Sequence, residues 1–245
     1  MIHIGCAGWA LPKAEQAAFP AEGTHLQRYA ARFNAVEINS SFYRPHQPAT
    51  YARWADSVPA SFRFSVKVPK AITHERRLVD AEALLDAFLA QAGALGDRLG
   101  CLLVQLPPSL KLAPDQAEGF FKALRQRHTG PVALEPRHAS WFTDEAVQLL
   151  KSQQISRVAA DPALLPAASE PSGDVRDTAY FRLHGSPRIY YSAYDEAALD
   201  AIAQSLTRAR GHTDHVWCIF DNTALGAATA NALALAERLL ATPTA

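Results

Sequence analysis

Eight short apolar runs divide this chain of 245 residues, and most of the segments between them have the pattern of amphipathic helices. The runs are Ile2–Cys6, Ala35–Asn39, Phe62–Lys67, Gly100–Leu106, Val132–Glu135, Arg157–Asp161, Ala179–His184 and His215–Phe220. Short strands that alternate with helices predict a parallel sheet. Eight such units in about 250 residues are typical of a barrel. We therefore predict an α/β fold, a single (β/α)8 TIM-type barrel formed by residues 1–245.

The helical segments support the same prediction. The clearest are Ala81–Ala94, Asp115–Arg127, Thr143–Gln153, Glu196–Arg208 and Ala224–Leu240. In the first of them Leu85, Phe88 and Leu89 share one face, which is expected to pack against the outside of the strands. Residues 163–177 are rich in Pro, Ser and Ala where the sixth helix would lie, so we expect an irregular sixth connection.

Amino-acid composition argues against several functional classes. Lys and Arg together number 24, as do Asp and Glu, so no overall charge favours nucleic acid or a membrane surface as partner. The three cysteines stand in apolar runs and are expected to be reduced. No apolar run approaches the ~20 residues that span a bilayer. We expect a cytoplasmic protein, and the sequence specifies no oligomeric state.

Polar residues stand where nearly every run ends. A parallel barrel gathers the carboxyl ends of its strands on one face, so these residues should converge. Alternation along a strand places Arg182 and His184 inward when Phe181 and Leu183 face the helices. The same argument turns Glu37, Asn39, Ser65, Lys67, Gln105, Glu135, Asp161 and Tyr180 inward. At the last strand it leaves Asp221 and Asn222 as alternatives.

Several of these strings together resemble a known family. They are Gly5-Cys-Ala-Gly-Trp9, Val36-Glu-Ile-Asn-Ser-Ser-Phe-Tyr-Arg44, Ile72-Thr-His74, Gln105-Leu-Pro-Pro108, Glu135-Pro-Arg-His138 with Trp141, Tyr180-Phe-Arg-Leu-His-Gly185 and Asn222 with Asn231. The chain is similar to the YecE-like family, which is labelled domain of unknown function 72. The resemblance implies a β/α barrel without an established reaction. Asp221 departs from the family pattern of two adjacent asparagines, and Cys6 stands where a small hydroxyl residue is common.

The first functional hypothesis is an enzyme without a cofactor that performs acid/base chemistry on a small anionic substrate, a phosphate or a carboxylate. The expected catalytic residues are Glu37, Lys67, Glu135, Asp161 and His184, with Glu37 or Glu135 as base and Lys67 as acid or stabiliser. The expected substrate-binding residues are Trp9, Asn39, Tyr43, Arg44, His74, Gln105, Arg137, His138, Trp141, Arg182 and Asn222. Arginine forks suit phosphate and carboxylate oxygens.

Two alternatives stay open. Glu135, Asp161, His184 and Asp221 fall on four consecutive strand ends and suit a divalent metal ion. That set is similar to the sites of xylose-isomerase-like and endonuclease-IV-like barrels, which implies an isomerase or a phosphodiester hydrolase. The other alternative is a non-catalytic barrel that binds a ligand or nucleic acid, because aromatic residues beside arginines can stack bases.

Overall fold

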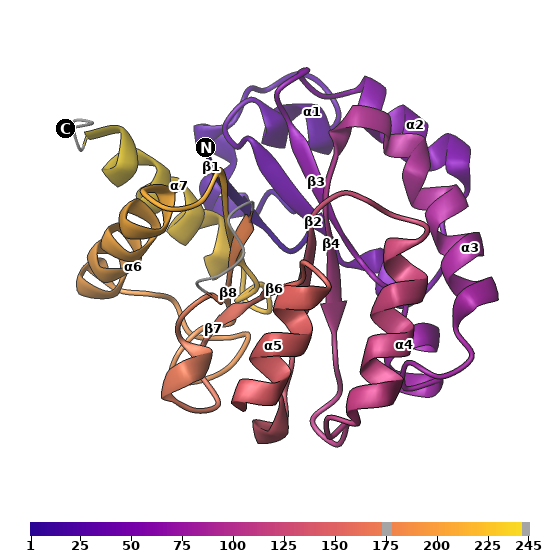
Figure 1. The fold of residues 1–245 in the computed structure, drawn as a ribbon. Coiled ribbons are helices and arrows are strands. Elements are labelled where there is room, and N and C mark those ends of the chain that lie inside the picture. Colours follow the sequence, from indigo (N-terminus) through magenta and orange to yellow (C-terminus); the bar gives the residue numbers. More distant parts are fainter. Residues whose placement is uncertain (173–177, 242–245) are drawn as a thin grey trace.

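The computed structural model describes residues 1–172 and 178–241, and within these ranges parallel strands alternate with helices (Figure 1). The strands are β1 (Ile2–Cys6), β2 (Ala35–Ile38), β3 (Arg63–Lys67), β4 (Leu99–Gln105), β5 (Val132–Glu135), β6 (Ser156–Arg157), β7 (Ala159–Asp161), β8 (Thr178–Leu183) and β9 (His215–Phe220). The helices are α1 (His25–Ala30), α2 (Pro48–Asp56), α3 (Glu82–Ala92), α4 (Pro114–Arg125), α5 (Asp144–Ser152), α6 (Glu196–Arg210) and α7 (Ala227–Ala241).

The strands form two parallel sheets, in the orders β2-β3-β4-β5-β6 and β1-β9-β8-β7. The predicted sixth strand is interrupted at Val158, whose N–H donates to the Leu134 carbonyl at 2.8 Å. Its first part, β6, pairs with β5, and its second part, β7, pairs with β8. The structure thus shows an α/β fold with parallel strands, but not the continuous hydrogen-bonded barrel that the sequence predicted.

The other junction lies between β1 and β2, where side chains replace most of a ladder. The Tyr29 hydroxyl accepts from the Cys6 N–H at 2.8 Å and donates to the Ala35 carbonyl at 3.2 Å. A single bridge joins Ala7 to Glu37 beyond it. Gly5 is required here, because a Cβ atom at this position would lie 2.1 Å from the Ala35 oxygen.

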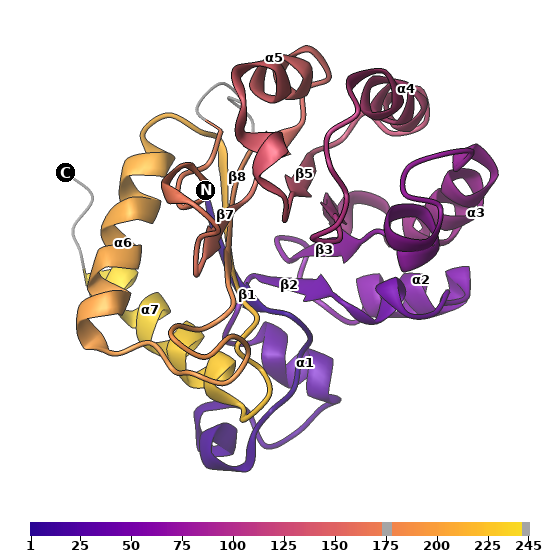
Figure 2. The ribbon, with the colours of Figure 1, turned by 90° about the horizontal axis from the view of Figure 1, so that it is seen from below.

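The helices form an outer layer around the strands (Figure 2). The predicted bounds of β1, β5 and β9 agree with the structure. In the irregular sixth connection, residues 163–172 contain a 3-10 turn at Pro166–Ala168, and residues 173–177 lie outside the described ranges. No helix in the described ranges is long and apolar enough to cross a membrane.

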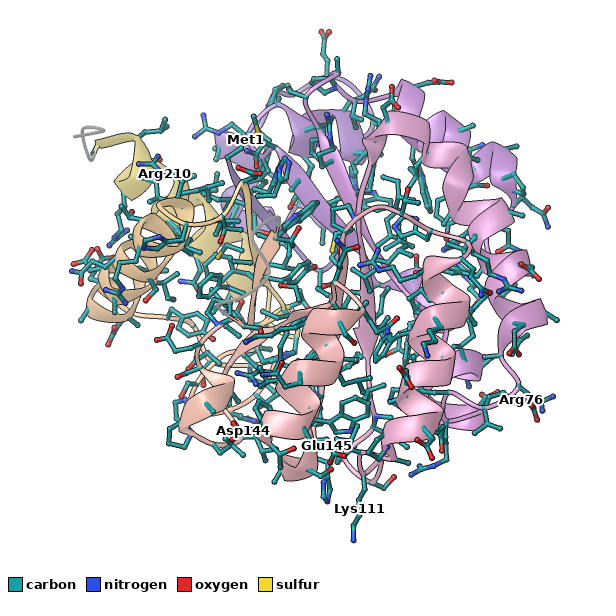
Figure 3. The ribbon with its side chains drawn as sticks, in the orientation of Figure 1. Met1, Arg76, Lys111, Asp144, Glu145 and Arg210 are labelled. Atoms are coloured by element: carbon teal, nitrogen blue, oxygen red, sulfur yellow. The ribbon has the colours of Figure 1, made fainter. Side chains whose placement is uncertain are left out.

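The parallel strands give the molecule two distinct ends. Figure 3 shows Met1 at the end where β1 begins, and Arg76, Lys111 and Asp144 at the opposite end, in segments that follow β3, β4 and β5. Loops after strand ends are therefore gathered on one face, where the polar residues of the strand ends also lie.

Candidate functional site

Side chains that face the space between the two sheets change from apolar to polar along the strands. Leu103 of β4, Tyr180 of β8 and Ile219 of β9 belong to a small buried cluster, separate from the main core against the helices. The next inward positions on β8 and β9 are Arg182 and Asp221. An apolar layer therefore underlies the polar residues at the carboxyl ends of the strands.

Arg182 is the centre of this polar cluster, with 1% of its surface exposed. Its guanidinium donates to both oxygens of Glu37, at 3.0 and 2.8 Å, and to Glu135 Oε2 at 3.1 Å. One of its terminal nitrogens also lies 3.0 Å from Asp221 Oδ2. Glu37 is fully buried. We predicted Glu37 as a base, and in the structure both of its oxygens accept from Arg182, so Glu37 fixes the guanidinium.

His184 links two of the same carboxylates. Its Nε2 lies 2.8 Å from Glu135 Oε1, and its Nδ1 lies 3.0 Å from Asp221 Oδ2. Burial alone would lower the pKa of His184, but Glu135 and Asp221 outweigh burial and raise it. Burial opposes ionisation of Glu135 too, yet Arg182 and His184 hold its pKa well below the ordinary value. The ring therefore fits a protonated imidazolium that donates from both nitrogens.

Arg137 and Tyr190 form the outer edge of the cluster. Arg137 donates to Glu135 Oε1 from Nε at 3.2 Å and from a terminal nitrogen at 3.0 Å, and 26% of its side chain is exposed. The Tyr190 ring packs edge-on against His184 with centroids 5.7 Å apart. The Tyr190 N–H donates to the His184 carbonyl at 2.6 Å. A ligand that approaches the cluster from solvent would meet these two side chains.

Lys67 ends β3 and is 5% exposed. Its Nζ lies 4.2 Å from the centroid of the Phe42 ring. The Ser41 hydroxyl lies 2.7 Å from the Lys67 carbonyl oxygen and ties the end of β3 to the segment after β2. Within the described ranges, no carboxylate oxygen lies within 4.0 Å of Nζ. Burial, followed by the charge of Arg182, lowers the pKa of Lys67 from 10.5 to about 8.

His74 lies on the other side of Phe42. The two rings meet edge-on with centroids 4.9 Å apart, and the Thr73 hydroxyl lies 2.9 Å from His74 Nδ1. Burial, with a further effect of Lys67, lowers the pKa of His74. A histidine that stays neutral at pH 7 beside a protonated lysine offers a ring nitrogen to a ligand.

Asn39 and Gln105 were predicted to bind substrate, and both stand at strand ends. Asn39 follows β2, and its Oδ1 is buried with no hydrogen-bond partner among the described residues. Gln105 is the last residue of β4 and is 7% exposed. A buried amide oxygen without a partner is costly, so Asn39 Oδ1 is available to a ligand.

Asp161 does not join the cluster. The Tyr194 hydroxyl donates to Asp161 Oδ2 at 2.6 Å, which holds the carboxylate toward the loop after β8. The alternative metal site required Asp161 beside Glu135, His184 and Asp221. Among the described residues no group of three or more His, Cys, Asp or Glu side chains is arranged to hold a metal ion. The Arg182 guanidinium contacts Glu135 and Asp221 where the ion would need them, so the predicted metal set does not fit.

Trp9, Tyr43 and Arg44 lie at the margin of the site. Trp9 packs edge-on against Trp54 with centroids 5.0 Å apart. Tyr43 is 67% exposed, and with Arg44 it lines a hollow of about 380 Å³ between the segments after β2 and β3 and helix α3. Within the described ranges, neither Tyr43 nor Arg44 makes a side-chain hydrogen bond or ring contact with Arg182 or His184.

His138 and Trp141 have local partners. His138 Nδ1 accepts from the Ser140 N–H at 3.1 Å and begins the short helix at Ala139–Phe142. Trp141 is 1% exposed, and its indole N–H donates to the Leu110 carbonyl at 2.9 Å. We predicted that Trp141 binds substrate, and in the structure its indole packs beneath the loop after β4 with its N–H satisfied.

Asn222 also turns away from the cluster, because Asp221 takes the inward position at the end of β9. Asn222 Nδ2 donates to the Ser192 carbonyl at 3.0 Å and to Asn231 Oδ1 at 2.9 Å. Asn231 in turn donates to the Tyr194 carbonyl at 2.9 Å. The two asparagines therefore hold the loop after β8 against α7. Asn222 Oδ1 is buried with no hydrogen-bond partner among the described residues, so substrate binding by Asn222 stays a prediction.

Ser65, Tyr180 and Tyr190 take part in the site but were absent from the predicted site residues. The Tyr180 hydroxyl donates to Glu37 Oε2 at 3.0 Å and lies 2.9 Å from Ser65 Oγ. Alternation placed Ser65 and Tyr180 inward, so a signal existed for both. Tyr190 lies in the loop after β8, where periodicity does not predict which way a side chain points.

Fold and site together define an α/β protein of parallel strands with a buried, charged site at their carboxyl ends. The chain belongs to the family described as "Protein of unknown function DUF72", whose model matches residues 3–245.

A curated relative, the UPF0759 protein YecE of Escherichia coli K12, is 30% identical over 190 residues. The match covers 72% of this chain and 65% of that protein. The crystal structure of a DUF72 family protein from Thermotoga maritima MSB8 superposes with a TM-score of 0.82 at 25% identity, covering 98% of this chain and 99% of that one. Pyruvate kinase from Pyrobaculum aerophilum, at 12% identity, gives a TM-score of 0.51 over 100% of this chain and 72% of its own. That likeness concerns the fold alone.

Proposed function

We propose that this chain is an enzyme that performs acid/base chemistry on a small anionic substrate at the carboxyl ends of its strands. The observation that carries the proposal is Lys67, a residue that is 5% exposed and whose Nζ has no carboxylate within 4.0 Å among the described residues. Glu37, Glu135 and Asp221 favour the charged form of Lys67 without a direct ion pair, and burial outweighs them, so an anionic ligand in direct contact would compensate the charge.

The charge balance of the cluster supports an anionic ligand. Its carboxylates are Glu37, Glu135 and Asp221, and its cations are Lys67, Arg137, Arg182 and protonated His184. The cations therefore exceed the carboxylates by one charge when His184 is protonated. One anionic group on the substrate would balance the site.

Lys67 and His184 carry the proposed proton transfers. A general acid or base acts best when its pKa lies near the working pH. Lys67, with a pKa of about 8, meets this condition, and Glu135 and Asp221 raise the pKa of His184 above its ordinary value. Glu135 has a pKa too low for a base and serves to orient His184 and Arg137.

The proposal includes a (β/α)8 arrangement in which β6 and β7 act as one strand. The Tyr29 hydroxyl and the Ala7–Glu37 bridge would then close the remaining seam. The three cysteines are free and buried, which supports a cytoplasmic, reducing location.

Binding of sulfate tests the proposal, because sulfate does not titrate near neutral pH. We expect calorimetry to show binding to the wild-type protein that weakens as pH rises through about 8, where Lys67 loses its proton. Lys67→Met should abolish binding. Lys70→Met is the control, because Lys70 is exposed and pairs with Glu75 at 3.1 Å. Unchanged binding by Lys67→Met, or stronger binding at high pH, contradicts the proposal.

A further inference from the structure

A hollow of about 290 Å³ opens beside the cluster, at the low end of the roughly 300–1,000 Å³ common for ligand sites. Its polar lining consists of Glu135, Arg137 and His184. The other described residues that line it are apolar, and they include Phe142 and Val158. A charged group and a hydrocarbon surface therefore face the same space.

Two exposed hydrophobic residues border this hollow from different loops. Leu164, in the segment after β7, is 56% exposed, and Ile189, in the segment after β8, is 42% exposed. Large apolar side chains that gather at a concave surface usually mark a binding site. A ligand with an apolar body would remove both side chains from water.

The polar end of the hollow suits a carboxylate. Arg137 is partly exposed, and of the five N–H donors of its guanidinium two bond Glu135 and another bonds the Tyr190 side chain. The protonated ring of His184 lies 3.3 Å from an Arg137 terminal nitrogen, so two positive groups stand side by side at this wall. Glu135 lies at the same wall and pairs with both, so the two cations exceed its carboxylate by one charge and an anion would be attracted to them.

We propose that the substrate is an amphiphilic organic acid, with its anionic head among the cations of the cluster, between Lys67 and Arg137, and its alkyl or aromatic body in this hollow. This inference rests on the proposed function and adds the substrate class. A sugar phosphate is the poorer fit, because its hydroxyls would face apolar walls without hydrogen-bond partners, a loss of tenfold or more in affinity for each.

A series of straight-chain carboxylates from acetate to octanoate tests the inference by calorimetry on the full chain at pH 7. We expect affinity to rise about fourfold with each methylene, which corresponds to about 0.8 kcal/mol, until the hollow is filled. Leu164→Asp should remove most of this gain while acetate still binds. Leu240→Asp is the matched control, because Leu240 is 87% exposed at the end of α7, among residues that surround Met1.

The outcomes separate the two proposals. If acetate and sulfate bind in a Lys67-dependent manner but affinity does not change with chain length, the amphiphilic substrate is refuted and the proposed function stands. If glycerol 3-phosphate binds more tightly than hexanoate, the substrate class is again wrong. If affinity still rises with chain length in both Arg137→Met and Leu164→Asp, the acid binds elsewhere and the inference is overturned. If no anion binds at any pH, both proposals fail.

Discussion

Replacing Lys67 by methionine should stabilise the protein. The side chain is 5% exposed, and burial lowers its pKa from 10.5 to about 8. At 1.36 kcal/mol per pKa unit, folding disfavours the charged amine by about 3 kcal/mol. Methionine has a similar length and no charge, so Lys67→Met should raise the free energy of unfolding at pH 7 by up to about 3 kcal/mol. Stability would thus rise while sulfate binding is lost.

The dependence on pH distinguishes this effect from better packing. Between pH 8 and 10.5 the unfolded wild-type chain holds the Lys67 proton and the folded one does not, so wild-type stability rises with pH. The advantage of Lys67→Met should therefore shrink above pH 8 and vanish above 10.5. Urea unfolding at pH 7 and pH 10 measures it, with Lys70→Met as a control expected to stay within about 0.5 kcal/mol. A variant less stable than wild type, or an advantage equal at both pH values, would refute the reasoning.

Two further predictions concern His184 and the seam between β1 and β2. Because the pKa of His184 is raised in the folded protein, its stabilisation should be fully present below pH 6.5 and lost as pH rises through the folded-state pKa. The free energies of unfolding of wild type and His184→Gln should therefore converge from pH 6 to pH 9. A difference that stays constant over this range would be evidence against the ion pairs. Gly5→Ala should cost more than about 2 kcal/mol, because the new Cβ would lie 2.1 Å from the Ala35 oxygen. Gly93→Ala, with nothing within 4 Å and φ of −60°, should be neutral or stabilising by melting temperature, and equal losses at the two glycines would contradict the steric argument.

The sequence was most informative where one periodicity governs a whole segment. On β8, alternation placed Arg182 inward, and the strand has that orientation, because a strand of six residues with apolar residues on its helix-facing side admits one register. At β9 the alternation is equally regular, and Ile219 fixes Asp221 as the inward residue. Reading the strand from Trp217 rather than from its end would have resolved the choice between Asp221 and Asn222.

Partners across the fold could not be predicted in the same way. Asp161 has a suitable position, but Tyr194, which lies 33 residues later in a loop, captures its carboxylate. The seam at Tyr29 depends on one hydroxyl that replaces ladder hydrogen bonds, and no local pattern encodes that replacement. The lowered pKa of Lys67 results from burial and from the charge of Arg182, against which three carboxylates act. Those carboxylates make their direct ion pairs with Arg182 instead.

That distribution leads to a prediction about Arg182 itself. Arg182→Met would leave Glu37, Glu135 and Asp221 buried without their shared cation, a loss of about 3–5 kcal/mol. Leu183→Ala, on the adjacent buried position, should cost about 2–5 kcal/mol through a cavity. Lowering the pH distinguishes the two losses of unfolding free energy, because only the loss in Arg182→Met depends on charge.

In the Arg182 variant the carboxylates would have raised pKa values, so protonation as pH falls from 7 to 5 relieves their repulsion and stabilises the folded state. In the wild-type protein Glu135 and Asp221 have lowered pKa values, and their contribution is lost only at more acid pH. The deficit of Arg182→Met should therefore narrow between pH 7 and pH 5 in urea unfolding, while that of Leu183→Ala stays constant. A deficit of Arg182→Met that is the same at both pH values would mean that Arg182 stabilises the fold by packing, and the charge balance from which we infer an anionic ligand would lose its foundation.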